Sequence, residues 1–320
     1  MKNIFFLALT FSTTLAYCQF SGAAGTNAST AIAKDSSIII AWATNCNVER
    51  GLINISDANS GFATYGQASD AIGHADLSGI VSLGDSGAAV LTFANGIFNG
   101  PGPDFAVFEN SFSDSFLELA HVEVSSDGIN FFRFPSDFLQ NILQIGPFDE
   151  LSEPEKMNNL AGKYRMGFGT PFDLQELDGT IGLNINGITH IKIIDAVGSI
   201  SAPYGSQDQN GNFINDPFPT PFPSSGFDLD AVGVIYQTGV NDLAETESSS
   251  ILIYPNPAND FLFIKSSVQI ENLALSNTVG KVIYSGKASE IDLIDYSSGV
   301  YVLFVQLHNG TTVTKRILMN

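Results

Sequence analysis

Short apolar runs, each closed by Gly, Asn, Asp or Ser, are the feature that most limits how this chain can fold. The runs are "SIIIAWAT", "AAVLTFA", "DFAVFEN", "LAHVEVSSDG", "INFFRFP", "THIKIIDAVG" and "LDAVGVIYQ". Runs of this length predict β-strands, whereas apolar residues at helical spacing are largely missing. Many short strands separated by turn residues predict an all-β sandwich or jelly roll rather than a parallel α/β sheet.

The composition agrees with this fold class. Hydrophobic residues make up 44% of the chain, enough for a real core, while charged residues make up only 14%. The 30 Gly and 25 Phe suit a β-rich exported protein better than a helical cytosolic one. The Ser-Asp-Gly at 126–128 predicts a hairpin turn, and helices are expected only in short pieces, such as one around 151–161.

The first residues predict an export signal. A basic start precedes an apolar run from Ile4 to Leu15, followed by small residues up to Cys18. This pattern predicts a signal peptide over 1–18, with Gln19 first in the mature chain. The apolar run is too short for a stable bilayer span. Lipid attachment at Cys18 is the alternative, but Tyr17 is bulky where such sites carry Gly or Ala.

Removal of the signal leaves Cys46 as the one cysteine of the mature chain. No intramolecular disulfide can form, so the core must hold the fold together, with bound metal as a further stabiliser. A catalytic thiol would need a partner histidine, and the four histidines show no thiol-enzyme spacing. Cys46 is therefore expected to be a small buried hydrophobe.

The composition of the sequence changes at "TGVNDLAETESSS", residues 238–250. This segment is polar and acidic, which predicts a linker. It separates a domain over 19–237 from a smaller one over 251–320. The smaller unit contains "ILIYPNPANDFLFIKSS", "LALSNTVGKVIYSG", "IDLIDYSSGVYVLFVQLHNG" and "TTVTKRILMN". About seven short strands in this length predict a small immunoglobulin-like β-sandwich.

The tail segments "YPNPANDFLFI", "LSNTVGKVIY", "IDLIDYSSGVYVLFV" and "KRILMN" resemble the C-terminal sorting domain of the Bacteroidota type IX secretion system. The resemblance implies that the protein passes through the periplasm and across the outer membrane by the type IX machinery. It also implies that the tail is removed, with release of the protein or its attachment to the cell surface. A small adhesion-like sandwich with its own binding task is the alternative.

The first domain also has segments that resemble those of a known protein family. The segments "VSLGDSGAAVLTFANGIFNGPGPDFAVFENSF", "FLELAHVEVSSDGINFFRFP" and "SSGFDLDAVGVI" are similar to those of a family of bacterial cell-surface proteins. The resemblance implies a galactose-binding-type jelly roll, a link to outer-membrane nutrient uptake, including that of corrinoids, and an outer-membrane receptor as partner. Such a fold-level analogy carries no function by itself.

The chain is strongly acidic, with 33 Asp and Glu against 13 Lys and Arg and a formal net charge of −20. A surface of this sign repels nucleic acid and anionic lipid. Clustered carboxylate and amide oxygens suit a hard cation, so Ca²⁺ is the expected cofactor. The alternative is that the acidity serves only solubility.

The segment "DQNGNFIND" at 208–216 surrounds a glycine with acidic and amide side chains, partly like a calcium loop. It lacks the bidentate Glu at position twelve, so it is not an EF-hand, and a polar hairpin turn explains it as well. In "GFDLDAVGV", strand alternation places two close carboxylates on one face, where they repel unless a cation or Arg neutralises them. The predicted calcium ligands are Asp104, Glu109, Asn110, Asp208, Asn210, Asn212, Asp216, Asp228 and Asp230.

The segment "GPGPDFAVFENSF" at 100–112 begins as a turn and continues as a strand whose two faces are both apolar. A strand of this kind suits the middle of a sandwich. The oxygens at its ends belong to Asp104, Glu109 and Asn110, for which metal ligation or turn capping fits better than acid catalysis. We expect some of them to converge with Asp228 or Asp230.

Motifs of catalysis are sparse. "GDSGA" at 84–88 lacks the nucleophile-elbow pattern, and the chain has no H-E-x-x-H motif, Cys/His zinc set or phosphate loop. A glycosidase needs two carboxylates at a set separation, which one sequence cannot show. The carboxylates from which such a pair could come are Asp104, Glu109, Glu118, Glu123, Asp195, Asp228 and Asp230.

Ligand recognition on such folds usually comes from loops that carry aromatic residues. The stretch 215–226 holds four prolines, which stiffen a loop that presents two phenylalanines. The aromatic residues expected to contact a ligand are Tyr164, Phe168, Tyr204, Phe218 and Phe222. We therefore interpret the chain as an exported, non-catalytic, calcium-stabilised module that binds a glycan, a nutrient or a surface partner. An extracellular polysaccharide hydrolase and a purely structural adhesin are the alternatives.

Overall fold

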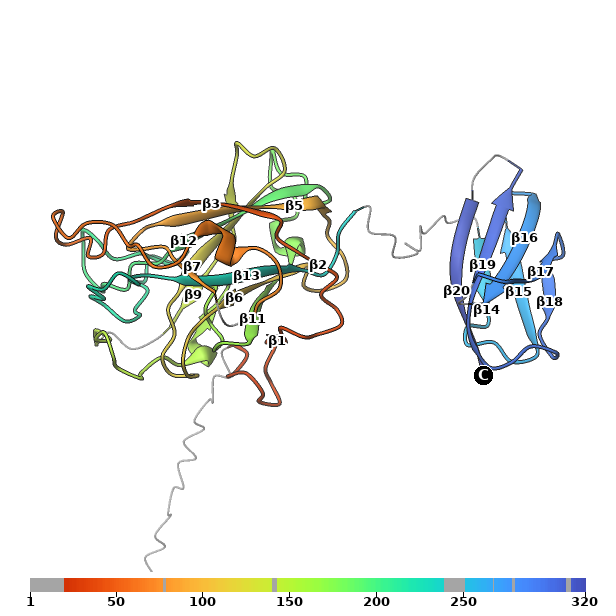
Figure 1. Ribbon diagram of the computed structural model, residues 1–320, viewed down its shortest axis with the longest axis horizontal. Helices are drawn as coiled ribbons and strands as arrows, with labels where there is room; N and C mark the ends of the chain where they lie inside the picture. The colour runs from red at the N-terminus through yellow and green to blue at the C-terminus, as the bar shows by residue number, and fades with distance from the viewer. Residues whose placement is uncertain are drawn as a thin grey trace, which may run out of the picture. The chain divides into compact units, whose positions relative to one another are not determined.

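The computed structural model describes residues 20–76, 79–139, 143–238, 251–266, 268–277, 280–308 and 312–320. The chain divides into two compact units, residues 1–239 and 240–320, and both are built of strands (Figure 1). The predicted signal peptide and all but the first residue of the predicted linker lie outside the described residues. Within the described ranges, no helix has the length and apolar character needed to span a membrane.

One sheet of the first unit has a late strand of the domain in its interior. Its hydrogen-bonded order is β1 (Ile32–Ala33), β11 (Phe168–Phe172), β6 (Phe105–Glu109), β13 (Asp228–Val234) and β2 (Ala41–Trp42), and β4 (Val81–Ser82) also pairs with β13. The pairings within this sheet are antiparallel. The sheet therefore joins segments that are distant in the sequence.

The second sheet of this unit is also antiparallel. Its order is β3 (Asn45–Glu49), β5 (Ala88–Ile97), β12 (Ile188–Asp195), β7 (Ala120–Ser125) and β8 (Phe132–Arg133). A separate two-stranded pair consists of β9 (Asp137–Phe138) and β10 (Met157–Asn158). The turn at 126–128 joins β7 to β8 as the predicted hairpin, with Glu123 opposite Arg133.

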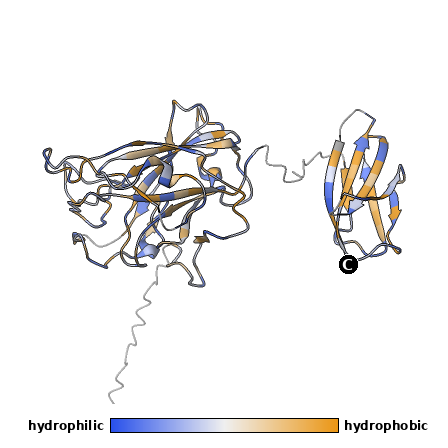
Figure 2. Ribbon diagram, in the orientation of Figure 1, coloured by the Kyte–Doolittle hydropathy of each residue, from blue (hydrophilic) through white to orange (hydrophobic). Residues whose placement is uncertain are grey.

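The two sheets share one hydrophobic core. Leu91, Val122 and Ile191 from one sheet are buried in the same cluster as Phe105 and Val232 from the other. Figure 2 shows apolar stretches along the strands of both units. Burial of one such side chain stabilises the fold by about 1.5–3 kcal/mol. The first unit is thus a β-sandwich, which confirms the fold class predicted from the sequence.

Strand β6 is buried along its whole length. Phe105 and Val107 lie in the core between the sheets. Ala106 and Phe108 lie in a second cluster on the opposite face, which includes the half-buried Trp42. The strand is therefore buried on both faces, as its apolar residues predict.

Helical structure in the described residues is limited to three short 3-10 turns. They are η1 (Ala68–Ala71), η2 (Pro154–Lys156) and η3 (Leu174–Leu177), and η2 lies where a short helix is predicted. The run "SIIIAWAT" forms a shorter strand than its apolar residues suggest. Ile39 N donates to Ser36 O in a turn, and the strand of this run, β2, consists of two residues that pair with β13. Cys46 is buried in the core, and burial raises the pKa of its thiol to about 11.

The second unit contains seven strands in its described residues. One sheet has the order β14 (Ile251–Tyr254), β15 (Phe261–Ser266) and β18 (Glu290–Asp292). The other has the order β17 (Val282–Gly286), β16 (Ile270–Asn277), β19 (Gly299–Leu307) and β20 (Thr312–Met319). Leu262, Leu275 and Leu303 from the two sheets meet in one core, so this unit is a small β-sandwich.

Candidate functional site

The end of β6 and the start of β13 bring two acidic residues together. In the antiparallel register Glu109 lies opposite Leu229, the residue that follows Asp228, and the charge of Asp228 acts on Glu109. The register shifts between Leu229 and Ala231, so the strand is irregular at Asp230. Bulges of this kind bend a strand, re-aim neighbouring side chains and are frequent next to functional sites.

A cavity of about 290 Å³ opens beside this strand end. We call it the carboxylate pocket. Its lining residues are Phe112, Phe116, Glu118, Pro147, Phe148, Glu150, Thr220, Phe222, Ser224 and Asp228. They come from the segment between β6 and β7, the loop around 147–150, the proline-rich loop and the start of β13, so four distant parts of the sequence build one site.

Glu109 is 1% exposed and does not itself line the pocket. Its Oε2 accepts hydrogen bonds from the backbone amide of Ser111 at 2.7 Å and from the Ser111 hydroxyl. Its Oε1 is buried and has no hydrogen-bond partner among the described residues. Burial raises the pKa of Glu109 well above its ordinary value, and the neighbouring charge of Asp228 raises it further.

Asp228 is half-buried at the pocket wall and accepts a hydrogen bond from the Ser82 hydroxyl. Burial raises its pKa to about 7, against the opposing effects of Ser82 and of the positive charge of Arg50. The Arg50 guanidinium donates to the carbonyl oxygens of Ser82, Tyr65 and Gly66. Arg50 is thus a nearby cation whose hydrogen bonds are already used by the backbone.

Glu118 is the third acid of this group. Burial raises its pKa well above the ordinary value, and the charges of Asp228 and Glu109 follow as the next causes. Glu150, also in the lining, accepts hydrogen bonds from the hydroxyls of Ser113 and Ser115 at 3.3 and 3.1 Å. Glu118, Glu109 and Asp228 therefore form a group of acids that resist ionising together.

Phenylalanine rings form the apolar part of the wall. Phe112 is 79% exposed and Phe148 is 75% exposed, values that leave most of each ring open to solvent. The ring centroids of Phe112 and Phe116 are 5.9 Å apart, and those of Phe148 and Phe222 are 5.5 Å apart. Two aromatic pairs beside several carboxylates make an amphipathic cavity of the kind that binds small polar ligands.

Asp104 lies at the opposite end of β6 from Glu109 and has a different environment. Its Oδ1 accepts from the backbone amide of Gly100 and its Oδ2 from that of Leu174, both at 2.7 Å. Burial raises its pKa to about 6. Of the oxygens at the ends of β6, only those at the Glu109 end lie near Asp228, so the predicted convergence holds for Glu109 and not for Asp104.

The predicted calcium loop is closed by its own hydrogen bonds. Asp208 Oδ1 accepts from the backbone amides of Asn210 and Asn212 at 2.8 and 2.9 Å. Its Oδ2 accepts from the amide of Phe138 and the side chain of Asn212 at 2.9 and 3.0 Å. Asp208 therefore caps this turn with both of its oxygens.

The remaining predicted metal ligands are dispersed. Asp216 is buried, and its Oδ2 accepts from the amide of Leu119 at 2.9 Å. Asp230 is buried at the irregular position of β13, while Asn110 is half-buried beyond the end of β6. In the described part of the chain, no group of three His, Cys, Asp or Glu side chains is arranged to hold a metal ion.

The five aromatic residues predicted to contact a ligand do not form one surface. Phe222 lines the carboxylate pocket. Tyr204 is exposed, whereas Phe218 is half-buried. Phe168 is half-buried with the Arg165 guanidinium 4.7 Å from its ring centre.

Tyr164 belongs to a second cavity, of about 190 Å³. Its hydroxyl is hydrogen-bonded with Ser21 at 2.7 Å and with Thr30 at 2.9 Å. The buried Lys163 also lines this cavity, and its Nζ donates to Ser21 Oγ and to Met157 O. These bonds tie the first described residues to the sandwich.

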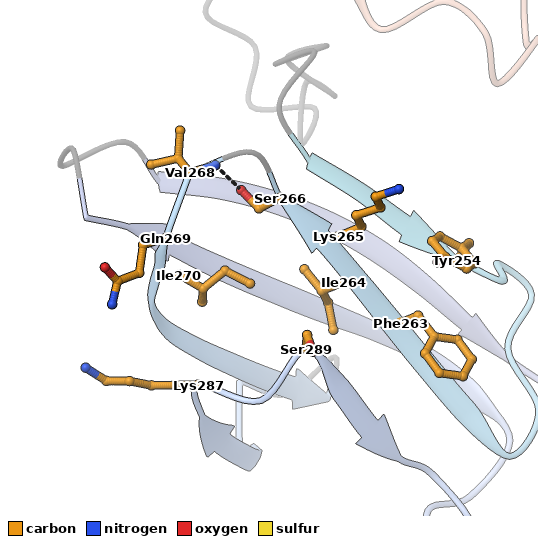
Figure 3. Close-up of a pocket in the computed structure, with 10 residues that line it drawn as sticks. All are labelled: Tyr254, Phe263, Ile264, Lys265, Ser266, Val268, Gln269, Ile270, Lys287 and Ser289. Carbon is orange, nitrogen blue, oxygen red and sulfur yellow. Dashed lines mark hydrogen bonds between the residues drawn. The ribbon is translucent and has the colours of Figure 1, made fainter.

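The second unit has a cavity of its own, of about 660 Å³. Figure 3 shows it between β15 and the start of β16, with Val268 N donating to Ser266 Oγ at one end. Lys265 and Lys287 are the basic residues of its lining, and Tyr254 and Phe263 are the aromatic ones. The lining has no carboxylate, so its character is opposite to that of the carboxylate pocket.

Sequence reasoning missed the phenylalanines that complete the carboxylate pocket, namely Phe112, Phe116 and Phe148. The signal for the first two was the short segment "NSFSDSF", in which two phenylalanines stand among polar residues directly after a buried strand. Aromatic residues in polar loops are exposed unless another element covers them. Phe148 carried no comparable signal.

Comparison with protein families identifies the second unit. Residues 252–320 match the secretion system C-terminal sorting domain. The protein therefore carries a domain recognised by the type IX secretion machinery and is exported to the cell surface or the extracellular space, which confirms the predicted localisation. The family of the first unit is not identified, and no curated protein matches the chain.

Solved structures give only distant likenesses. One is Faecalibacterium prausnitzii β-glucuronidase, 12% identical over 90% of this chain and 46% of that chain, with a TM-score of 0.22. Another is the glycoside hydrolase domain of Spr0440, Endo-D from Streptococcus pneumoniae R6, 9% identical over 87% of this chain and 37% of that chain, with a TM-score of 0.14. The chain spans less than half of either structure, and likenesses this weak carry no argument.

Proposed function

We propose that this exported protein is a non-catalytic binding module that holds one end of an extracellular glycan in the carboxylate pocket. The observation that carries the proposal is the combination, in one cavity of about 290 Å³, of paired phenylalanine rings with several carboxyl groups. Pockets for small molecules are mostly apolar and aromatic, with a few polar groups that fix orientation.

The chemistry of the wall suits a sugar ring. Phenylalanine rings pack against the C–H face of a sugar, and the two aromatic pairs frame the cavity. A protonated carboxyl group both donates and accepts a hydrogen bond, so acids of raised pKa match hydroxyl groups in either orientation. A corrinoid is a larger ligand, which a cavity of this volume would hold only in part.

The test is a binding measurement on the full chain with a panel of neutral and charged oligosaccharides. Phe148→Ala is expected to weaken binding about tenfold, which equals about 1.4 kcal/mol. Phe62→Ala is the matched control, since Phe62 is 61% exposed and does not line the pocket. Equal binding by both variants, or no binding by the unsubstituted chain, would contradict the proposal.

A hydrolase is the second candidate, because acids of raised pKa converge in a concave site. One such acid protonates the leaving oxygen in glycosidases while a second, ionised carboxylate acts on the sugar. Release of new reducing ends from a bound oligosaccharide, lost in Glu118→Gln, would favour this candidate over simple binding. We also propose calcium as a stabiliser of the fold. A melting temperature that is the same with calcium and with chelator would contradict this role.

A further inference from the structure

We infer that the carboxylate pocket selects a ligand with a protonated amine, and that its sugar is an amino sugar with a free ammonium group. This inference rests on the proposed glycan-binding function and narrows its ligand class. Its first basis is the charge of the lining. Three carboxylates, Glu118, Glu150 and Asp228, line the cavity, and its described lining contains no Lys, Arg or His.

The second basis is independent of the number of acids. Glu109 is 1% exposed, yet its Oε1 lacks a hydrogen-bond partner among the described residues. Burying a carboxylate oxygen without a partner is costly. The charge of Asp228 raises the pKa of Glu109, and the charges of both raise the pKa of Glu118, so Glu109 belongs to the same acidic group as the pocket wall. An ammonium ion supplies both the donors and the charge that this group lacks.

The charged groups around the site neutralise it only in part. Arg50 lowers the pKa of Asp228, but it does not line the pocket, and its guanidinium is held by the carbonyl oxygens of Tyr65, Gly66 and Ser82. The other charges acting on Glu118, from Asp216 and Asp195, are negative. The field in the pocket therefore favours a cation from outside.

The walls favour an organic cation over a metal ion. In the described residues no three acidic or histidine side chains are arranged to ligate a metal. Phenyl rings offer a metal ion no oxygen, whereas they attract an ammonium group through cation–π contact and pack against its carbon frame. An amino sugar has both a ring face that packs against phenylalanine and an ammonium charge that pairs with carboxylates.

The test compares three tetrasaccharides that share one β-1,4 backbone, built from glucosamine, N-acetylglucosamine or glucose. Binding to the full chain is measured at pH 7. We expect the glucosamine tetramer to bind at least about tenfold more tightly than the other two. Equal binding of the three overturns this inference and leaves the proposed function standing. Failure of all three to bind overturns this inference, and the wider oligosaccharide panel then decides the proposed function.

Proton release gives a second readout that a merely structural acid would not produce. A bound cation favours the ionised carboxylates, so at pH 5.5, where the amines of the glucosamine tetramer are already protonated, its binding should displace protons into the buffer. Calorimetry in buffers of different ionisation enthalpy measures this release. Absence of proton release overturns the inference.

Variants locate the effect in the pocket. Glu118→Gln should reduce the preference for the glucosamine tetramer about tenfold while leaving the melting temperature nearly unchanged. Glu49→Gln is the matched control, because Glu49 is exposed at the end of β3 and outside the pocket. A preference that survives Glu118→Gln in a folded variant overturns the assignment, and proton release by the unsubstituted chain remains informative if that variant does not fold.

Discussion

The two ends of β6 carry acids of the same chemical type in opposite situations. At one end, both carboxylate oxygens of Asp104 accept backbone amides, from Gly100 and Leu174. At the other end, Glu109 uses one oxygen for Ser111, and its second has no partner among the described residues. Both acids are buried, so burial alone does not distinguish them. The difference lies in the second oxygen, which is used by a backbone amide in Asp104 and has no partner among the described residues in Glu109.

The largest expected effect comes from removing the capping acid. Asp104→Ala leaves two buried backbone amides without an acceptor, at about 1–3 kcal/mol each. We expect the free energy of unfolding to fall by about 3 kcal/mol, which corresponds to roughly 6–12 °C in melting temperature. Denaturant and thermal unfolding of the full chain measure this change.

The control for this variant is Asp178→Ala, because Asp178 is exposed and follows the short turn η3. It is expected to change the free energy of unfolding by less than about 0.5 kcal/mol. If Asp104→Ala is as stable as Asp178→Ala, the amide bonds at this end of β6 contribute little, and the contrast between its two ends fails.

The next effect is a loss of stability with rising pH. Burial raises the pKa of Asp228 to about 7 and that of Asp195 to about 8, above the value near 4 of an unfolded chain. The folded state therefore holds more protons than the unfolded state between these values. The stability present below the unfolded pKa is lost as the pH rises through the folded pKa.

We expect the free energy of unfolding to be about 2 kcal/mol lower at pH 7 than at pH 6, since each of the two groups contributes about 1 kcal/mol over this step. Chemical denaturation at constant ionic strength across this range measures the slope. A free energy that rises with pH would show that the buried acids are ionised more easily in the folded state, and the raised pKa values would be wrong.

The smallest effect is expected at the other end of β6. Glu109→Gln keeps an acceptor for Ser111, removes one like charge and gives the pocket acids a donor. We expect it to raise the free energy of unfolding by about 1 kcal/mol at pH 8 and by less at lower pH, because burial raises the pKa of the native carboxyl and a neutral amide has no charge to bury. Loss of stability at pH 8, measured beside Glu49→Gln, would show that Glu109 is needed as an anion.

Much of the fold follows from local pattern. The segment at 105–108 is apolar on both faces, so its burial within a sandwich is readable from the residues themselves. The sorting domain is equally readable, because its turns and strands keep a recognisable order in residues 252–320. The local pattern predicts a longer strand than is present in the run "SIIIAWAT", where the amide of Ile39 donates to Ser36 O in a turn.

The pocket depends on information that is not local. Glu109 and Asp228 meet only through an antiparallel register between β6 and β13, and an irregularity at Asp230 sets the alternation around them. The sequence also cannot show which carboxylates will accept hydrogen bonds from backbone amides. Asp208 has the neighbours of a metal ligand, but the amides of its own loop take its oxygens.

The position of β13 has a consequence for biosynthesis. This strand is the last of the first unit, yet it pairs with β2, β4 and β6 inside the sheet (Figure 1). Pairings across such sequence separations form slowly, because chain entropy must be lost first. The sheet cannot close until residues 228–234 have been synthesised, a short stretch before the sorting domain begins. The first unit of a nascent chain therefore stays incompletely folded until residue 234 has been synthesised, shortly before the sorting domain follows.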